Sequence, residues 1–343
     1  MELQIFGKLP ANARLERILK SSNYKEGSFR NLRETPMLGE DTNYWKMLRS
    51  FFSKPSNTTP SKPLPSVITR LDTLTDDYPV IVWFGHSSYL LRINGLNILV
   101  DPVLSGSAAP FSFMVKAYKG ANVYSVNDLP PIDILILTHD HFDHADCISL
   151  KKMMPGVQQI ITSLGVGAHL EYWDFDKNKI IEMDWWDKYV AAPGMEFTAA
   201  PARHFSGRGL KRAQTLWSSF ILKTPTHTIY IGGDSGYDTH FKNIGDAYGP
   251  FDLVILESGQ YNKQWPFIHM MPEETVQAAV DLKGKLLLPV HWGKFTLSLH
   301  PWNEPIKRIL TKANELQVSV TTPMIGEPVL LGNMHPSSIW WNI

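Results

Sequence analysis

The sequence predicts a mixed α/β (α+β) fold in which two sheets pack between outer helices as a four-layer αββα sandwich. Short apolar runs of strand length alternate with helix-like segments along most of the chain. Several of these runs end in side chains that can bind metal, as expected where strand ends converge on one edge. The chain has 343 residues, 43% of them hydrophobic, which is enough for one such domain with a large core.

The strand predictions begin near residue 77. Val80–Phe84 and Tyr89–Ile93 are apolar runs, and Asn94-Gly95 predicts a hairpin turn into Leu96–Val100. Ile132–Leu137 predicts a further buried strand. Helices are predicted at Cys147–Met154, Pro272–Leu282 and Pro305–Leu316. The second of these helices has Pro, Glu and Glu in its first turn, as helix N-termini favour.

Residues 1–76 are predicted to form an N-terminal extension, and residues 77–343 the main domain. The extension has helical character at Ala13–Ser21 and Asn43–Phe52. Lys54–Pro65 contains four prolines among Ser, Thr and Asn, which predicts an extended linker.

The charge balance argues against nucleic acid as a partner. Lys+Arg and Asp+Glu both number 33, so the net charge is zero. Cys147 is the only cysteine, which excludes an intrachain disulfide and favours a reducing, cytoplasmic location. We expect no signal peptide, because the N-terminus lacks an apolar segment, and no run reaches the ~18 apolar residues of a membrane span. Peripheral membrane contact, the oligomeric state and whether an N-terminal leader was removed stay open.

The most informative segment is the pattern H-x-H-x-D-H formed by His139, His141, Asp143 and His144, directly after the strand predicted at 132–137. Neutral imidazoles and a carboxylate together suit zinc, and also iron or manganese. A solvated loop that is rich in histidine by chance is the alternative. It gives no reason for matching ligands elsewhere in the chain.

Three further ligand candidates each follow a strand-like run: His204, Asp234 and His291. Strand ends that converge on one edge make a cleft, and seven ligands are enough for two divalent ions. Asp234 can bridge the two ions, because each of its carboxylate oxygens can bind one.

Over about residues 79–335 the chain resembles the metallo-β-lactamase fold superfamily, specifically its binuclear hydrolases. The closer resemblance is to the N-acylphosphatidylethanolamine-hydrolysing phospholipase D family. The motifs that carry it are Trp83–Ser88, Leu99–Pro102, Pro201–Phe205, Gly233–Tyr237, His269–Glu274 and Val290–Phe295.

The resemblance implies a ligand set for each of two metal ions. His139, His141 and His204 hold the first ion; Asp143, His144 and His291 hold the second; Asp234 bridges them. It also implies that His269 faces the substrate, where it contacts a phosphate or assists the leaving group. Redox di-iron relatives have glutamate where His141 stands here, which favours hydrolysis over oxygen chemistry.

Several residues have two possible roles. Asp101 either orients a ligand histidine or caps a turn before Pro102. His86 is either a substrate-binding residue or a core histidine, and His269 either faces substrate or precedes a helix. Cys147 more plausibly begins a buried helix than ligates metal. Arg208 belongs to a local basic patch and is a candidate contact for phosphate.

The segment Ser105–Ser125 is unusually apolar and aromatic for a loop. Either it packs on the domain or on another subunit, or it forms an acyl-chain pocket or a membrane-contact surface, with Trp185, Trp186 and Trp265 at the same mouth.

The expected function is that of a binuclear metal-dependent hydrolase, a phospholipase D-like phosphodiesterase acting on a small-molecule or lipid phosphodiester. A metal-bridging hydroxide would be the nucleophile, with Asp143, Asp234 and His269 as catalytic residues. No G-x-S-x-G motif suggests an acyl-enzyme. A lactonase or carboxylic-ester hydrolase is the enzymatic alternative, and a non-catalytic metal-binding scaffold is the other.

Overall fold

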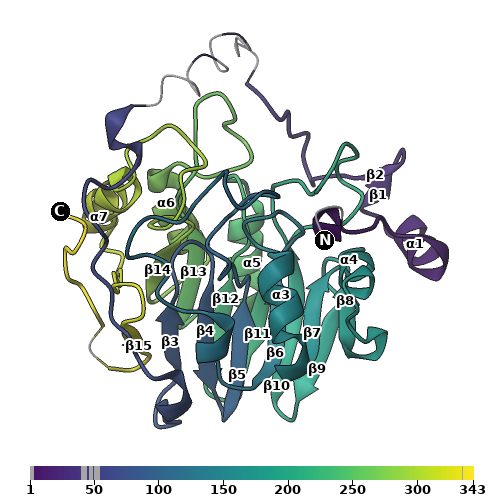
Figure 1. Cartoon of the computed structure of the whole chain (residues 1–343), viewed down its shortest axis with the longest axis horizontal. Helices are drawn as coiled ribbons and strands as arrows, with labels where there is room; N and C mark the ends of the chain where they lie inside the picture. The colour runs from purple at the N-terminus through teal and green to yellow at the C-terminus, as the bar shows by residue number, and fades with distance from the viewer. Residues whose placement is uncertain (1–3, 40–44, 46–48, 50–54, 334) are drawn as a thin grey trace.

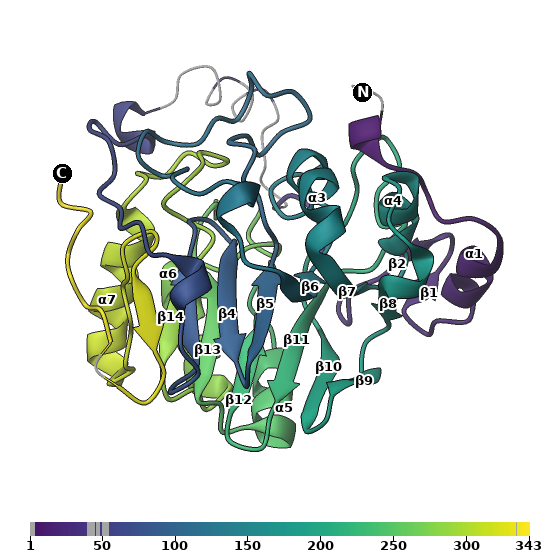
Figure 2. The same cartoon turned by 60° about the horizontal axis from the view of Figure 1, so that its bottom comes forward.

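The computed structural model describes residues 4–39, 45, 49, 55–333 and 335–343. A seven-stranded and a six-stranded sheet lie face to face, with helices on the two outer faces (Figures 1 and 2). The predicted four-layer αββα sandwich is therefore confirmed.

The first sheet has the order β15-β3-β4-β5-β6-β7-β8. Strands β15, β3, β4 and β5 pair antiparallel, whereas β5 to β8 pair parallel. The strands are β3 (Val80–Trp83), β4 (Tyr89–Ile93), β5 (Leu96–Val100), β6 (Ile132–Leu137), β7 (Val157–Ser163), β8 (Ile180–Met183) and β15 (Pro328–Leu330).

The second sheet has the order β14-β13-β12-β11-β10-β9. Strands β14 to β12 are parallel, and β12 to β9 are antiparallel. The strands are β9 (Lys188–Ala192), β10 (Met195–Pro201), β11 (Ser218–Lys223), β12 (Thr228–Ile231), β13 (Leu253–Glu257) and β14 (Leu287–Val290).

The alternation of side chains along each strand explains why the layers stack. Ile81 and Trp83 of β3 join the core between the sheets, whereas Val80 and Val82 face outward and pack with α3. The main helices are α3 (Cys147–Met153), α4 (Gly167–Tyr172), α5 (His240–Tyr248), α6 (Pro272–Asp281) and α7 (Glu304–Leu316). Short 3₁₀ helices are η1 (Gln4–Phe6), η2 (Ser56–Thr58), η3 (Leu71–Thr73), η4 (Val126–Asp128), η5 (Met154–Gly156) and η6 (Lys177–Lys179). The three predicted helices of the main domain are confirmed to within one residue at each end.

The N-terminal extension contains α1 (Asn12–Leu19) and a two-stranded sheet of β1 (Tyr24–Lys25) and β2 (Ser28–Phe29). Helix α1 confirms most of the prediction at Ala13–Ser21; the helix predicted at Asn43–Phe52 falls almost wholly outside the described residues. Ile18 and Phe29 pack in a buried cluster with Leu164 and Trp217, so the extension lies against the residues that follow β7 and precede β11. The division at residue 76 stays a prediction.

Among the described residues, no helix is both long and apolar enough to cross a membrane. The loops that carry the predicted ligands follow β6, β10, β12 and β14 and gather above one edge of the two sheets (Figure 1).

Candidate metal centre

The structure brings all seven predicted ligands together in two adjacent clusters. His139, His141, His204 and Asp234 form the first cluster; His86, Asp143, His144 and His291 form the second. Within each cluster the donor atoms all lie within 4.8 Å of one another. Asp234, His269 and His291 form a third, overlapping group by the same criterion. That these residues bind metal stays a prediction, which their geometry can test.

The first cluster has the geometry of a cation site. Nε2 of His139 lies 2.9 Å from Nδ1 of His141, which in turn lies 3.3 Å from Nε2 of His204. Two nitrogens bound to one tetrahedral zinc would be about 3.4 Å apart, given Zn–N bonds of about 2.1 Å. Nδ1 of His204 donates to the carbonyl of Ile268 at 2.7 Å, which leaves the Nε2 lone pair for a ligand.

Ligand atoms without partners lie in the second cluster and on Asp234. Nε2 of His144, Nε2 of His291 and Oδ1 of Asp234 are buried and have no hydrogen-bond partner among the described residues. Such atoms are costly to bury unless a cation or water completes them. The donor set therefore fits divalent metal in both clusters.

Asp234 lies between the two clusters. Its Oδ2 is 3.7 Å from Nε2 of His204 and 3.2 Å from Nε2 of His144. Its Oδ1 is 3.2 Å from Nδ1 of His291. This position is the one that a bridging carboxylate needs.

Asp101 has the first of the two roles that the sequence left open, that of orienting a ligand histidine. Its Oδ2 accepts a hydrogen bond from Nδ1 of His144 at 2.7 Å, which directs Nε2 of that ring to the cleft. Its Oδ1 also accepts the backbone N–H of Thr138 at 2.9 Å. This bond fixes the start of the loop of residues 138–144 that carries four of the predicted ligands, called the ligand loop below.

Three residues at the site adopt left-handed backbone conformations, although none is glycine. The φ angles are +54° at His86, +41° at Asp101 and +67° at His291. Such conformations cost about 1–3 kcal/mol each and persist where the surroundings enforce them, typically at functional sites. Here the backbone N–H of His86 donates to the carbonyl of Trp292, and that of His291 donates to the carbonyl of His86, both at 2.9 Å.

Electrostatics favour neutral imidazoles in the first cluster and at His291, where burial lowers the pKa, and a positive charge at His144 in the second cluster. Burial holds the pKa of His139 and His204 well below the usual value, so both rings keep lone pairs for metal. Burial also disfavours charge on His144, but the carboxylates of Asp234, Asp143 and Asp101 outweigh it and raise its pKa well above normal. A divalent cation supplies the positive charge that these carboxylates favour.

His86 supports the second cluster rather than facing substrate. Its ring is fully buried, and its Nε2 lies 3.0 Å from Oδ2 of Asp143. The prediction that His86 binds substrate is therefore unsupported by its position. His269, by contrast, has a side chain that is 12% exposed at the clusters, as a substrate-facing residue requires.

The predicted substrate contact of Arg208 does not fit the structure. The side chain is buried, and its guanidinium donates to the backbone carbonyls of Ile5, Asp140 and Ala145 at 2.7–3.0 Å. Arg208 therefore ties the N-terminal segment to the ligand loop, and these bonds occupy the groups that would bind a phosphate. Sequence reasoning assigned it by charge alone, which does not reveal buried carbonyl partners.

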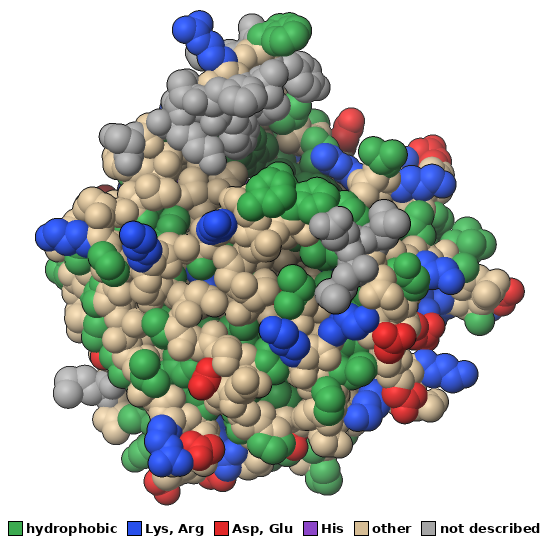
Figure 3. Space-filling model, viewed as in Figure 1, with side chains coloured by type: hydrophobic (Ala, Val, Ile, Leu, Met, Phe, Trp, Pro, Cys, Tyr) green, Lys and Arg blue, Asp and Glu red, His purple; other side chains and the backbone are tan. Residues whose placement is uncertain are grey.

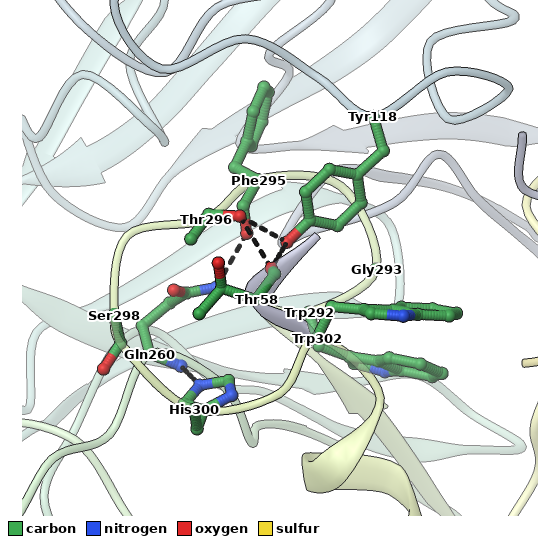
Figure 4. A pocket seen from close by; sticks show the side chains of 10 residues that line it. All are labelled: Thr58, Tyr118, Gln260, Trp292, Gly293, Phe295, Thr296, Ser298, His300 and Trp302. Atoms are coloured by element: carbon green, nitrogen blue, oxygen red, sulfur yellow. Dashed lines mark hydrogen bonds between the residues drawn. The ribbon is translucent and has the colours of Figure 1, made fainter. Parts of the chain in front are cut away.

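Hydrogen bonds to the linker and to other loops hold the segment that follows His291. Gln260 Nε2 donates to the carbonyl of His291 at 3.4 Å, and Thr296 Oγ1 donates to the carbonyl of Thr58 at 2.9 Å. Tyr118 OH lies 2.9 Å from Thr296 Oγ1. These residues line a cavity of about 10 Å³, room for about one water molecule (Figure 4). The linker (residues 54–65) and the apolar segment Ser105–Ser125, called the insert below, thus both hold the loop that carries His291.

The insert contributes to an apolar groove beside the ligand loop. The groove has a volume of about 690 Å³ and is lined by Gln4, Ile5, Pro110, Phe111, Ser112, Phe113, Cys147, Ile148, Lys151 and Lys152. Phe142 of the ligand loop contacts Phe6, which contacts Phe111, with ring centroids 5.9 and 6.4 Å apart. Figure 3 shows hydrophobic side chains gathered on this face above α3.

Cys147 begins α3 and is buried, and no metal-capable group of the described residues includes it.

The three tryptophans predicted at the same mouth lie elsewhere. Trp185 is buried against Trp217, and Trp186 stacks on Tyr248. Trp265 donates its indole N–H to the carbonyl of Gln260. None of the three lines the groove.

Comparison with known proteins agrees with the fold. A family model described as a beta-lactamase superfamily domain matches residues 96–292. An uncharacterised protein of Mycobacterium tuberculosis is 36% identical over 333 residues, which cover 94% of this chain and 88% of that protein. N-acyl-phosphatidylethanolamine-hydrolyzing phospholipase D 1 of Caenorhabditis elegans is 27% identical over 317 residues, 83% of this chain and 86% of that protein.

Among solved structures, Igni18, a metallo hydrolase from Ignicoccus hospitalis, superposes with a TM-score of 0.56 at 18% identity. The match covers 75% of this chain and 99% of that one. The fold, the convergent histidine and aspartate clusters and the family match agree, and the chain therefore belongs to the metallo-β-lactamase superfamily of metal-dependent hydrolases.

Proposed function

We propose that this hydrolase is a metal-dependent phosphodiesterase of the phospholipase D-like type, whose substrate carries a hydrophobic part. The observation that supports this most is the pair of donor clusters joined at Asp234, next to an apolar groove of about 690 Å³. A relative that matches most of the chain is named for hydrolysis of N-acyl-phosphatidylethanolamine, which is such a substrate.

The chain's own residues would hold two divalent ions, with zinc as the proposed metal and iron or manganese as alternatives. When bound, such ions acidify water and polarise a phosphoryl oxygen. Asp234 and Asp143 would orient the attacking water: the carboxylate of Asp234 lies between the two clusters, and that of Asp143 belongs to the second. His269 would contact the phosphate or its leaving group.

The exposed aromatic side chains beside the groove support contact with lipid. Phe113 is 73% exposed, and Ile148 is 40% exposed next to Lys151 and Lys152 of α3. Apolar side chains with neighbouring lysines suit an acyl chain and an anionic headgroup region. A cytoplasmic location is part of this proposal, since the single cysteine favours a reducing compartment.

A substrate comparison tests the proposal. Zinc-loaded protein is assayed with bis(p-nitrophenyl) phosphate, vesicles of N-acyl-phosphatidylethanolamine and a set of lactones, with Asp234→Ala as the inactive control. We expect cleavage of both phosphodiesters, with the lipid favoured in kcat/KM. Lactones cleaved far faster than any phosphodiester would place the enzyme with the lactonases instead.

A further inference from the structure

The buried guanidinium of Arg208 joins the N-terminal segment Gln4–Lys8 to the ligand loop. Its Nη1 donates to the carbonyls of Asp140 and Ala145, at 2.7 and 2.8 Å, and so spans a stretch that contains three of the predicted ligands. Its Nε and Nη2 both donate to the carbonyl of Ile5, at 3.0 and 2.7 Å. The guanidinium therefore bonds the loop through one nitrogen and the N-terminal segment through the other two.

Two further side chains hold the ends of this segment. The indole N–H of Trp173 donates to the carbonyl of Gln4 at 2.7 Å. At the other end, the backbone N–H of Lys8 donates to Nδ1 of His169 at 3.0 Å, and Nε2 of the same ring lies 3.1 Å from Oδ2 of Asp140. The segment is thus bound at both ends and in the middle, and two of these three attachments lead directly to the ligand loop.

Aromatic rings enclose the junction at Arg208. The guanidinium carbon lies 4.1 Å from the ring centroid of Phe142, in the ligand loop, and 4.9 Å from that of Trp173. Without the segment, the N–H groups of Nε and Nη2 would lose the carbonyl that they share, and a buried charged group that lacks hydrogen bonds is costly. The seated segment therefore stabilises the guanidinium in the position from which it holds the loop.

We propose that seating of the segment Gln4–Lys8 and metal binding at the ligand loop are coupled through Arg208, so that each stabilises the other. With the segment seated, Arg208 holds the backbone of residues 140–145; with the segment released, it loses half of its carbonyl contacts and frees the loop. Such coupling is reciprocal: the factor by which the segment raises metal affinity equals the factor by which metal favours the seated segment. The segment is thereby a positioning element of the metal centre.

Gly7 offers a substitution that disturbs the segment without changing the loop. Its φ is +70°, and a Cβ there would collide with the ring of His169. Either the segment lifts or the ring leaves Asp140, and both outcomes weaken the connection to the loop. Gly27→Ala is the matched control, because Gly27 has a φ of +79° in the same extension but nothing within 4 Å of the added Cβ. The two variants share similar backbone strain and differ in the collision.

Hydrogen exchange of the full-length chain, followed by mass spectrometry, measures the seating of the segment. The wild type is compared with and without bound zinc. We expect zinc to slow exchange at residues 4–9 by about 10-fold or more, in addition to slowing it at residues 140–146. Gly27→Ala should behave like the wild type, whereas residues 4–9 of Gly7→Ala should exchange fast in both states. A segment that only stabilised the fold would exchange equally with and without zinc, and that result in the wild type would overturn the proposal.

Zinc affinity, measured by competition with a chelator, is the reciprocal readout. Gly7→Ala should lower it about 10-fold or more, and Gly27→Ala by at most about twofold. Arg208→Lys should also lower it, because one ammonium nitrogen cannot bond the loop and the segment with the geometry of a guanidinium. If Arg208→Lys does not fold, Gly7→Ala and the wild-type exchange decide the question.

Equal zinc affinities in Gly7→Ala and Gly27→Ala, with the segment of Gly7→Ala exchanging fast, would contradict the coupling. Neither readout needs a substrate. The coupling can therefore hold even if the chain cleaves no phosphodiester, and a failure of the proposed function is distinguishable from a failure of the coupling.

Discussion

Asn31 in the N-terminal extension holds the backbone of His204 from both sides. Its Nδ2 donates to the carbonyl of His204 at 2.8 Å, and the backbone N–H of His204 donates to its Oδ1 at 3.1 Å. The same Oδ1 accepts the indole N–H of Trp217 at 3.0 Å. The extension therefore builds part of the candidate metal centre, although Asn31 and His204 are 173 residues apart in sequence.

Asn31→Ala should weaken metal binding in the first cluster, because His204 loses the contacts that orient it. Loss of such an outer contact typically costs about 10–100-fold in metal affinity. Zinc retention is measured by competition with a chelator. Asn23→Ala is the control, since Asn23 lies in the same extension but its side chain bonds only Asp184 among the described residues. Equal zinc loss in both variants would show that the extension acts through general stability.

Asp234→Ala should weaken both metal sites, whereas Asp143→Ala should chiefly empty the second. Asp234 faces both clusters, but Asp143 lies 3.6 Å from Nε2 of His144 and belongs only to the second. Both variants should lower turnover by orders of magnitude, because bound metal supplies the nucleophile. Elemental analysis of the purified proteins gives the stoichiometry.

Asp133→Asn serves as the control for these variants. Asp133 lies at the start of β6, away from the ligand loop, and accepts the backbone N–H of Asn97. It should keep about two metals per chain. Two metals and near-normal turnover in Asp234→Ala would exclude a bridging role for that residue.

Lys294 should make stability depend on pH above neutrality. Its buried Nζ donates to the carbonyls of Phe84 and Val103 at 3.0 and 2.9 Å, and burial lowers its pKa from 10.5 to about 7. Between these values the unfolded chain binds a proton that the folded chain lacks. The free energy of unfolding therefore rises with pH, by up to about 1.4 kcal/mol per unit, and falls back as pH drops towards 7.

Lys294→Met should remove this slope between about pH 7 and 10.5. Urea unfolding at several pH values in that window, compared with Lys307→Met at an exposed position, measures the difference. Parallel pH profiles for the wild type and Lys294→Met would contradict the assignment.

The ligand loop could be predicted because its signals are local. A continuous apolar run predicts a strand that ends just before His139. The pattern H-x-H-x-D-H then places four metal-binding side chains within six residues. The same argument located Asp234 and His291 after β12 and β14. These parts of the site follow from strand periodicity and residue chemistry alone.

The supporting contacts could not be predicted, because they join segments far apart in sequence. Nothing around Asn31 marks it as a partner of His204, and the charge of Arg208 suggested the surface although its guanidinium is buried among carbonyls. Glu257 reads as one polar residue at the end of an apolar strand. Its nearness to His269 arises only when β13 and the segment before α6 meet.

The hydrophobic part of the substrate is tested by replacing Phe111 and Phe113 with serine. The two rings stack with centroids 5.8 Å apart, and together they form the exposed wall of the apolar groove. Burying one phenylalanine is worth about 1.5–3 kcal/mol, so the pair of substitutions should raise KM for lipid vesicles about 10-fold or more. Hydrolysis of bis(p-nitrophenyl) phosphate should be nearly unchanged, because this small ester has no part that reaches the groove.

Ile68→Ser provides the control for that double variant, since Ile68 is 75% exposed and does not line the groove. It should leave KM unchanged for both substrates. The discriminating quantity is the ratio of the two KM values, because a general loss of folded enzyme lowers the rate with both substrates and leaves both KM values alone. If the serine variants instead change the oligomeric state and not the lipid KM, the aromatic wall is a contact between copies of the chain. The acyl chain must then bind elsewhere.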